Sequence, residues 1–130
     1  SSEAERRADA AERELMEWKA ARYMEQRLGE EFDALVIAVQ RFGMFVELLD
    51  VFVEGLVPMP AIEEAVGERC FYRERDHAIV TQRRQAVFRL GDRVRVRADR
   101  IDYFQMRTEF SLVTAAGRRP KTRPRRDPGR

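Results

Sequence analysis

The stretch that decides the fold covers residues 31–57 and reads EFDALVIAVQRFGMFVELLDVFVEGLV. Hydrophobic residues recur here at about every second position, as they do along half-buried β-strands. Phe32, Ala34 and Val36 share one face of the first predicted strand. The tripeptide Arg41-Phe42-Gly43 predicts a turn or bulge, because glycine adopts backbone angles that other residues avoid. The pattern therefore predicts two antiparallel strands that are joined at this turn.

The remainder of the chain predicts further short strands. They are expected at 44–49, 53–57, 94–97 and 101–112, with a hairpin formed by 70–72 and 78–81 and one helical turn over 61–66. In 94–97 the valines are expected to point inward and the arginines outward. Five or so short antiparallel strands in about 80 residues favour a closed or partly closed barrel of the five-stranded OB type. The predicted fold is mainly β, with one long α-helix before the barrel and a disordered basic tail after it.

The first 29 residues predict a single helix. Ser2 and Glu5 have the spacing of a capping box, no Gly or Pro occurs before Leu28, and Gly29 stands where a C-terminal cap is expected. One narrow stripe runs along it, formed by Ala4, Ala8, Ala11, Leu15 and Trp18. The stripe either packs on the helix's own domain or docks on a partner. We favour docking, because a rod of roughly 39 Å is too long for the small domain to cover.

Charge is distributed unevenly along the chain, whose net charge is +2. Residues 29–60 carry one basic and six acidic side chains, whereas residues 115–130 carry seven basic side chains and one acidic side chain. A tail this basic, with three prolines, cannot bury a core and is expected to be disordered. Its functional interpretation is an arm that contacts phosphates and releases their counterions, and its alternative is a merely solubilising tail.

Composition excludes several classes of protein. No run of about 18 apolar residues exists that could cross a membrane, and no apolar signal-peptide core is present. Cys70 is the single cysteine, which excludes an internal disulfide and a cysteine-rich zinc site, and it is expected in the core. His77 is the single histidine and is expected at the surface. The sequence predicts a cytoplasmic location without membrane contact. Because the chain opens on Ser1 in a helical pattern, we also expect it to be a piece of something longer.

Three motifs resemble a known family. They are Phe42-Gly43-Met44-Phe45-Val46-Glu47-Leu48, then Glu54-Gly55-Leu56-Val57, then Arg89-Leu90-Gly91-Asp92-Arg93-Val94, and in order and spacing they resemble the S1 RNA-binding domain. The helix around Glu5-Arg6-Arg7-Ala8-Asp9 resembles the closing helix of the catalytic domain in ribonucleases R and II, and the basic tail resembles the extension of ribonuclease R. The resemblance divides the chain into this helix at 1–29, an S1 domain at 30–114 and a basic tail at 115–130.

The family implies processive hydrolysis of single-stranded RNA from its 3′ end, with magnesium held by an aspartate cluster. That cluster belongs to a catalytic domain upstream of this chain, and nothing here replaces it, so we expect no cofactor and no RNA cleavage from this chain alone. The implied function is that of an accessory module that grips single-stranded RNA and feeds it to the catalytic domain. The helix stripe would then dock on that missing domain or on a second copy.

Several residues are candidates for RNA contact. An exposed Phe42 and Phe45 would form a stacking platform; from the residues alone a core position for one or both is the competing interpretation. The resemblance favours the platform and adds Asp102 and Arg107, with Arg107 offset by about one residue from the S1 pattern. It also shows one departure, Pro58 in place of a common histidine, which is expected to weaken binding or to shift it onto the arginines. Candidate phosphate contacts are Arg41, Arg95, Arg97, Arg118, Arg119, Lys121, Arg125 and Arg126.

A second function competes with RNA binding. In that interpretation the helix and the tail recruit protein partners, the barrel is only a scaffold, and outward arginines such as Arg95 and Arg97 are a solvated face. The acidic stretch 29–60 supports it, because it does not favour phosphate. RNA binding through several phosphates predicts a steep dependence on salt, which distinguishes the two functions.

Overall fold

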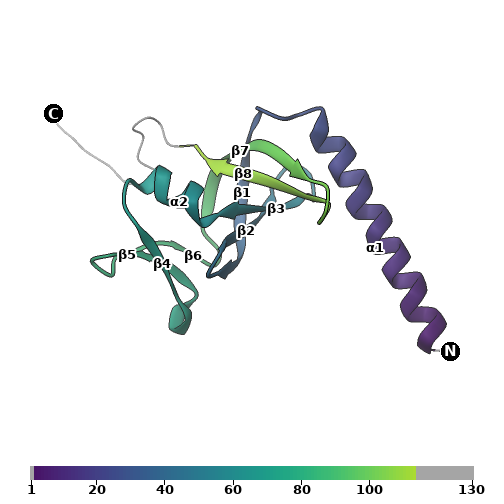
Figure 1. The fold of residues 1–130 in the computed structure, drawn as a ribbon, viewed down its shortest axis with the longest axis horizontal. Coiled ribbons are helices and arrows are strands. Elements are labelled where there is room, and N and C mark those ends of the chain that lie inside the picture. The colour runs from purple at the N-terminus through teal and green to yellow at the C-terminus, as the bar shows by residue number, and fades with distance from the viewer. Residues whose placement is uncertain (1, 114–130) are drawn as a thin grey trace.

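The computed structural model describes the backbone of residues 2–113 and the side chains of residues 10–113. Its central feature is a closed barrel in the strand order β1-β2-β3-β8-β7 (Figure 1). The strands are β1 (Glu31–Gln40), β2 (Gly43–Leu48), β3 (Glu54–Pro58), β7 (Arg93–Asp102) and β8 (Arg107–Leu112). β3 and β8 are parallel, and the other neighbours are antiparallel. The predicted five-stranded barrel is thereby confirmed.

The barrel interior is filled by alternate residues of its strands. Val36, Val46, Val57, Val96 and Phe110 have essentially no exposed surface. In β7 the valines are the more buried residues and Arg95 and Arg97 are exposed, as the alternation predicts. Gly55 lies inside the barrel, where an added Cβ would collide with the Phe110 ring and lie 2.5 Å from the Thr108 carbonyl oxygen. The close passage of β3 over β8 therefore depends on this glycine.

A second, smaller sheet of order β4-β5-β6 lies between β3 and β7 in the chain. It is reached through α2 (Met59–Val66) and consists of β4 (Cys70–Arg73), a 3₁₀ turn η1 (Glu74–Asp76), β5 (Ala78–Thr81) and β6 (Ala86–Arg89). The hairpin of β4 and β5 was expected; β6 was not, and α2 is longer than the single turn predicted. The turn before β6 places Arg84 at a φ of +69°, a conformation that sequence patterns associate with glycine or asparagine.

Helix α1 (Ser2–Glu25) ends before the predicted cap at Gly29. Gly29 has the expected left-handed conformation, with a φ of +92°, but it serves the entry into β1. Its N–H donates to the Ala98 carbonyl oxygen over 2.7 Å, and the Ala98 N–H donates to Glu30 over 3.0 Å. The helix is thus shorter than predicted: residues 26–29 form a turn, and the Gly29 N–H bonds to β7 instead of closing the helix.

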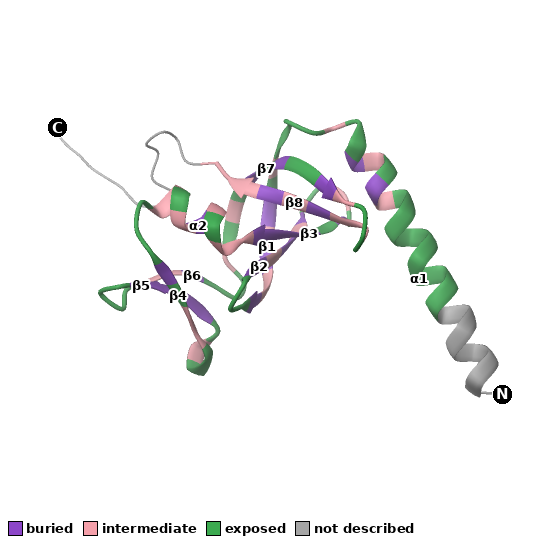
Figure 2. Cartoon of the chain, viewed as in Figure 1, coloured by how far each residue is buried: buried purple, intermediate pink, exposed green. Residues whose placement is uncertain are grey.

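Within the part of α1 whose side chains are described, residues 10–25, only the C-terminal end packs on the barrel. Ala21 and Met24 are buried there, whereas Leu15 and Trp18 of the predicted stripe are 53% and 50% exposed (Figure 2). Successive helical residues are about 100° apart, so the row of Ala21 and Met24 is turned away from the stripe. The barrel does not cover the stripe between Ala11 and Trp18. The side chains of the predicted capping box lie outside those described.

The described helices include none that is long and apolar enough to cross a membrane. Cys70 is buried, as expected, and His77 is exposed. The predicted tail at 115–130 lies outside the described residues.

Candidate nucleic-acid interface

Two aromatic rings meet at the turn between β1 and β2. Phe42 is 52% exposed at the turn and Phe45, on β2, is half-buried. Their ring centroids are 5.9 Å apart and the ring planes are inclined by 81°, an edge-to-face pair. Neither ring belongs to the buried core. The pair therefore presents aromatic surface to solvent on the outside of the barrel.

The turn that carries Phe42 is fixed by its contact with β3 and α2. The Phe42 carbonyl oxygen accepts a hydrogen bond from the Met59 N–H over 2.8 Å. Gly43 has a φ of +149°, and an added Cβ would collide with the Val57 carbonyl oxygen and lie 2.9 Å from Pro58 Cα. The absence of a side chain at Gly43 thus lets the turn lie close against the end of β3. Pro58, which replaces the expected histidine, is part of this contact.

A cation lies against the second ring. The guanidinium carbon of Arg107, on β8, is 5.3 Å from the centroid of Phe45, within cation–π range. Arg107 follows Met106, whose φ is +50°. The Arg107 Nε is buried and has no hydrogen-bond partner among the described residues. The structure thus brings together Phe42, Phe45 and Arg107, three of the residues that the sequence singled out.

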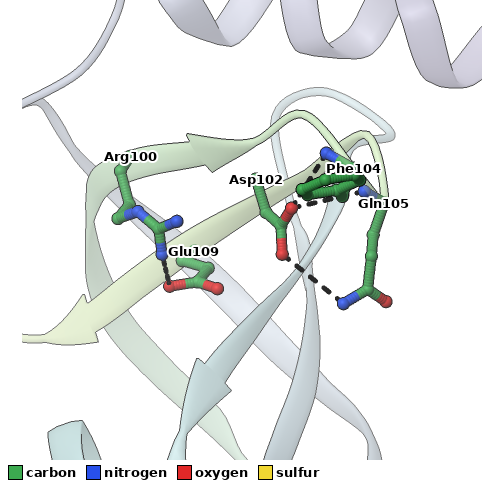
Figure 3. A network of polar contacts seen from close by, with 5 residues as sticks. All are labelled: Arg100, Asp102, Phe104, Gln105 and Glu109. Carbon is green, nitrogen blue, oxygen red and sulfur yellow. Dashed lines mark hydrogen bonds and ion pairs between the residues drawn. The ribbon is translucent and has the colours of Figure 1, made fainter.

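Asp102 holds the turn that precedes Arg107. One of its carboxylate oxygens accepts the N–H groups of Phe104 and Gln105 over 3.0 and 3.3 Å (Figure 3). The other accepts the Gln105 side-chain amide over 3.4 Å. Asp102 is also the cross-strand partner of Arg107. The carboxylate is therefore engaged in turn formation and helps to fix the position of Arg107.

The same turn carries two aromatic residues that the sequence interpretation missed. Phe104 is fully exposed, and Tyr103 is 57% exposed. The Tyr103 hydroxyl donates to the Glu25 carboxylate, which raises the pKa of Tyr103 and ties the turn to the end of α1. The sequence does contain a signal for them, because Tyr103 and Phe104 directly follow Asp102. They were missed because residues 101–112 were predicted to form strand.

The other predicted cations are distributed differently. Arg95 pairs with Asp33 over 3.0 Å and with Glu31 over 3.6 Å, and Arg97 pairs with Asp99 over 3.4 Å. These ion pairs lie on the outside of β1 and β7. Among the described residues, neither Arg95 nor Arg97 lies over the ring of Phe42 or Phe45, whereas Arg107 does lie over Phe45. Arg41, by contrast, is exposed beside Phe42 and has no ion-pair partner in the described part of the chain. Arg118, Arg119, Lys121, Arg125 and Arg126 lie outside the described residues.

Comparison with known proteins decides the family. A model described as "S1 RNA binding domain" matches residues 25–112, well over half of the chain. The chain belongs to the S1 RNA-binding domain family. The match includes the aromatic pair, Asp102 and Arg107.

Relatives of this S1 domain include ribonuclease R of Aquifex aeolicus, 42% identical over 112 residues, which are 86% of this chain and 16% of the relative. Ribonuclease R 1 of Lactococcus lactis is 37% identical over 128 residues, 93% of this chain and 15% of the relative. The chain thus spans about one sixth of the length of these relatives.

Solved structures support the fold. The apo form of Mycoplasma genitalium RNase R superimposes with a TM-score of 0.76 and 18% identity over 85% of this chain and 17% of that one. The same enzyme in complex with ribose methylated single-stranded RNA gives the same values.

The outer face of the S1 domain carries charges of opposite sign at the two ends of β2. Glu47 and Glu54 are direct cross-strand partners on β2 and β3, and Glu47 lies on the same face of β2 as Phe45. Neither forms an ion pair within the described residues. Arg41 lies at the opposite end of β2, next to Phe42. Glu47 and Glu54 therefore place negative charge at the end of β2 and β3 where β8 begins with Arg107, and Arg41 places a positive charge at the other end.

No group of three His, Cys, Asp or Glu side chains suited to a metal ion occurs in the portion of the S1 domain that the structure describes.

Proposed function

We propose that this S1 domain binds single-stranded RNA without sequence preference on the surface formed by Phe42, Phe45, Arg41 and Arg107. The observation that carries the proposal is the arrangement of Arg107 against Phe45, with Phe42 in an edge-to-face pair with the same ring. Exposed aromatic faces stack on bases of any identity, and neighbouring cations bind the phosphate backbone.

The exposed Phe104 extends this surface along the turn before Arg107. Its backbone is held by Asp102, so that its ring is presented to solvent at a fixed position of the turn. A solved RNase R of the same fold contains single-stranded RNA, which supports the choice of ligand.

We further propose that the domain acts as the RNA-gripping accessory module of a ribonuclease R-like 3′–5′ exoribonuclease. The support is the identity of 42% and 37% to ribonucleases R of which this chain spans about one sixth. In this role the domain would supply affinity and direct the strand, and hydrolysis would occur in another domain. The basic segment after residue 114 would add affinity through counterion release.

The test is fluorescence anisotropy with a labelled single-stranded RNA of about 15 nucleotides, at low and high salt. Each stacked base contributes about 1–3 kcal/mol by alanine substitution, so Phe42→Ala with Phe45→Ala should weaken binding at least about fivefold. Trp18→Ala is the matched control, because Trp18 is 50% exposed on α1, much as Phe42 is at the turn. The stacking proposal fails if the double variant binds RNA as the wild type does.

Truncation after Thr114 separates the barrel from the basic segment. We expect the truncated chain to bind RNA with a shallower salt dependence, since about 0.7 of the log–log slope is lost with each phosphate contact. Binding that disappears on truncation would show that the basic segment, not the barrel, holds RNA.

We also propose that the stripe of Leu15 and Trp18 docks on another domain of the same polypeptide. The stripe is about half exposed, and the barrel occupies a different face of α1. Sedimentation velocity tests this assignment, because the isolated chain should remain monomeric at high concentration. A dimer that Leu15→Gln dissociates would instead assign the stripe to a second copy.

A further inference from the structure

The sheet of β4, β5 and β6 lies beside the end of the barrel that carries Phe42. β6 contacts β1, and α2 contacts both β2 and β4. The first residue of α2, Met59, is hydrogen-bonded to the carbonyl oxygen of Phe42. In Figure 1 the small sheet extends from the same end of the barrel as the β1–β2 turn, away from α1. An RNA strand that leaves Phe42 in this direction would therefore meet the small sheet next.

This sheet presents an aromatic ring of its own. Phe71 on β4 is 44% exposed, and its cross-strand partner on β5 is the buried Val80. Arg73 lies on the same face of β4, two residues further along. It is held by Asp76, with Nε and a terminal nitrogen 2.9 and 2.8 Å from the two carboxylate oxygens, and it also donates to the Arg84 carbonyl oxygen over 3.3 Å. Arg73 thereby ties the β5–β6 turn to the strand that carries Phe71.

Three exposed arginines gather at one end of the same sheet. Arg69 directly precedes Cys70, which pairs with Thr81 in β5. Arg83 and Arg84 form the turn that follows Thr81, where the Arg84 N–H donates to the Thr81 carbonyl oxygen over 2.8 Å. None of the three arginines has a carboxylate partner among the described side chains. They are cations without a partner beside an exposed ring.

The local charge favours a polyanion. Residues 69–89 contain six arginines and two carboxylates, and one of these carboxylates, Asp76, is bound to Arg73. Residues 31–58 of β1 to β3 contain one arginine and five carboxylates. Glu47 and Glu54 face each other at the other end of β2, where β8 begins with Arg107. Toward the small sheet, by contrast, the arginines outnumber the carboxylates, so this direction also favours a polyanion.

We propose that the small sheet is a second contact for the same RNA strand, with a base stacked on Phe71 and phosphates bound by Arg69, Arg83 and Arg84. The inference rests on the proposed RNA binding of the barrel and lengthens its footprint beyond the β1–β2 turn. The residue types are those that non-specific single-strand binding requires, aromatic faces for bases and nearby cations for the backbone. No base-specific contact is involved.

The experiment compares two lengths of labelled single-stranded RNA on the full chain, about 5 and about 15 nucleotides, within the range of OB-fold site sizes. Phe71→Ala removes the ring, and Arg83→Gln with Arg84→Gln removes two cations from an exposed turn. The matched control is Arg13→Gln with Lys19→Gln, the same loss of charge on the exposed part of α1. Thermal unfolding identifies any variant that has lost the fold, and the turn variant tests the proposal independently of Phe71.

We expect both small-sheet variants to bind the longer RNA about fivefold or more weakly and the shorter RNA as the wild type does. The salt dependence of the turn variant on the longer RNA should be shallower by about 1.4 in log–log slope, for two lost phosphate contacts. Unchanged affinity for the longer RNA, an equal loss on the shorter RNA, or an equal loss in the α1 control would each overturn the second contact while leaving the barrel's function intact. Failure of the wild type to bind either RNA would overturn both proposals.

Discussion

The guanidinium carbon of Arg107 lies 5.3 Å from the ring centroid of Phe45, although the two residues belong to strands that are separated by β3. The contact places a planar cation against an aromatic face on the outside of the barrel. A base that stacks on Phe45 would therefore bring its phosphate close to a charge that is already positioned.

Replacement of Arg107 tests this arrangement. Arg107→Gln should weaken RNA binding about fivefold or more, because the cation that lies against Phe45 is removed. Arg107→Lys should recover part of the affinity, since it keeps the charge but not the planar group. Anisotropy titrations measure both, and equal binding by wild type and Arg107→Gln would contradict the assignment.

Gly43→Ala should destabilise the fold and displace the aromatic pair. The added Cβ would collide with backbone atoms of Val57 and Pro58, which cannot move without disturbing β3. We expect a loss of about 2 kcal/mol or more in the free energy of unfolding, measured with urea. Gly91→Ala is the control: its φ is +91° but the added Cβ meets nothing within 4 Å, so about 1 kcal/mol is expected. Equal losses would show that close packing at Gly43 is unimportant.

Glu47→Gln should increase both stability and RNA affinity. Like charges directly opposite each other in a sheet are destabilising by about 0.2–1 kcal/mol, and Glu47 faces Glu54. Removal of one charge should also reduce the repulsion of phosphates bound near Phe45. Glu14→Gln on the exposed part of α1 removes the same charge elsewhere. An equal gain in RNA affinity for Glu14→Gln would show that the gain for Glu47→Gln comes from the change in net charge alone.

Asp102→Ala should loosen the turn that precedes Arg107. Three hydrogen bonds to the carboxylate are lost, and we expect about 1–2 kcal/mol in the free energy of unfolding together with weaker RNA binding. Asp99→Ala provides a comparison, because Asp99 forms only exposed contacts with Arg97 and Ser111. RNA binding that survives Asp102→Ala unchanged would separate the turn from the interface.

The Cys70 thiol should be unreactive in the folded protein. Burial, followed by the charges of Glu63 and Glu68, raises the pKa of Cys70 from 9.0 to about 11. Alkylation at pH 8 should therefore be much slower in the native chain than in urea, because the thiolate is the nucleophile.

The same shift gives a pH dependence of stability. The folded state holds the thiol proton to a higher pH than the unfolded state, so the contribution of this group is complete below pH 9 and is lost between pH 9 and about 11. Cys70→Ala should lose less stability than the wild type over this interval. Parallel pH profiles for the two proteins would contradict the raised pKa.

Much of the barrel could be predicted from the alternation of residues. The strands around Phe42 and Gly43, the turn between them and the inward valines of β7 follow from a period of two, which depends only on backbone geometry. β6 was missed because Arg84, and not a glycine, adopts the left-handed conformation in the turn before it. The end of α1 was placed too late because Gly29 is used by a contact with Ala98, which lies far away in the chain.

The candidate site, like the fold, could be predicted only in part from the sequence. The sequence by itself determined the fold class and the turn at Phe42 and Gly43, since these depend on periodicity and local backbone chemistry. The candidate residues for RNA contact came from the resemblance to S1 domains, because the residues alone left a core position for Phe42 and Phe45 open. Only the tertiary structure decided which cations are available, because strand register places Arg95 opposite Asp33 but Arg107 beside Phe45. The tertiary structure alone shows that the Arg84 carbonyl oxygen is bound by Arg73, on the strand of Phe71, and that Phe104 is exposed. Pairing between charges depends on neighbours across strands, and the spacing of residues along the chain does not contain that information.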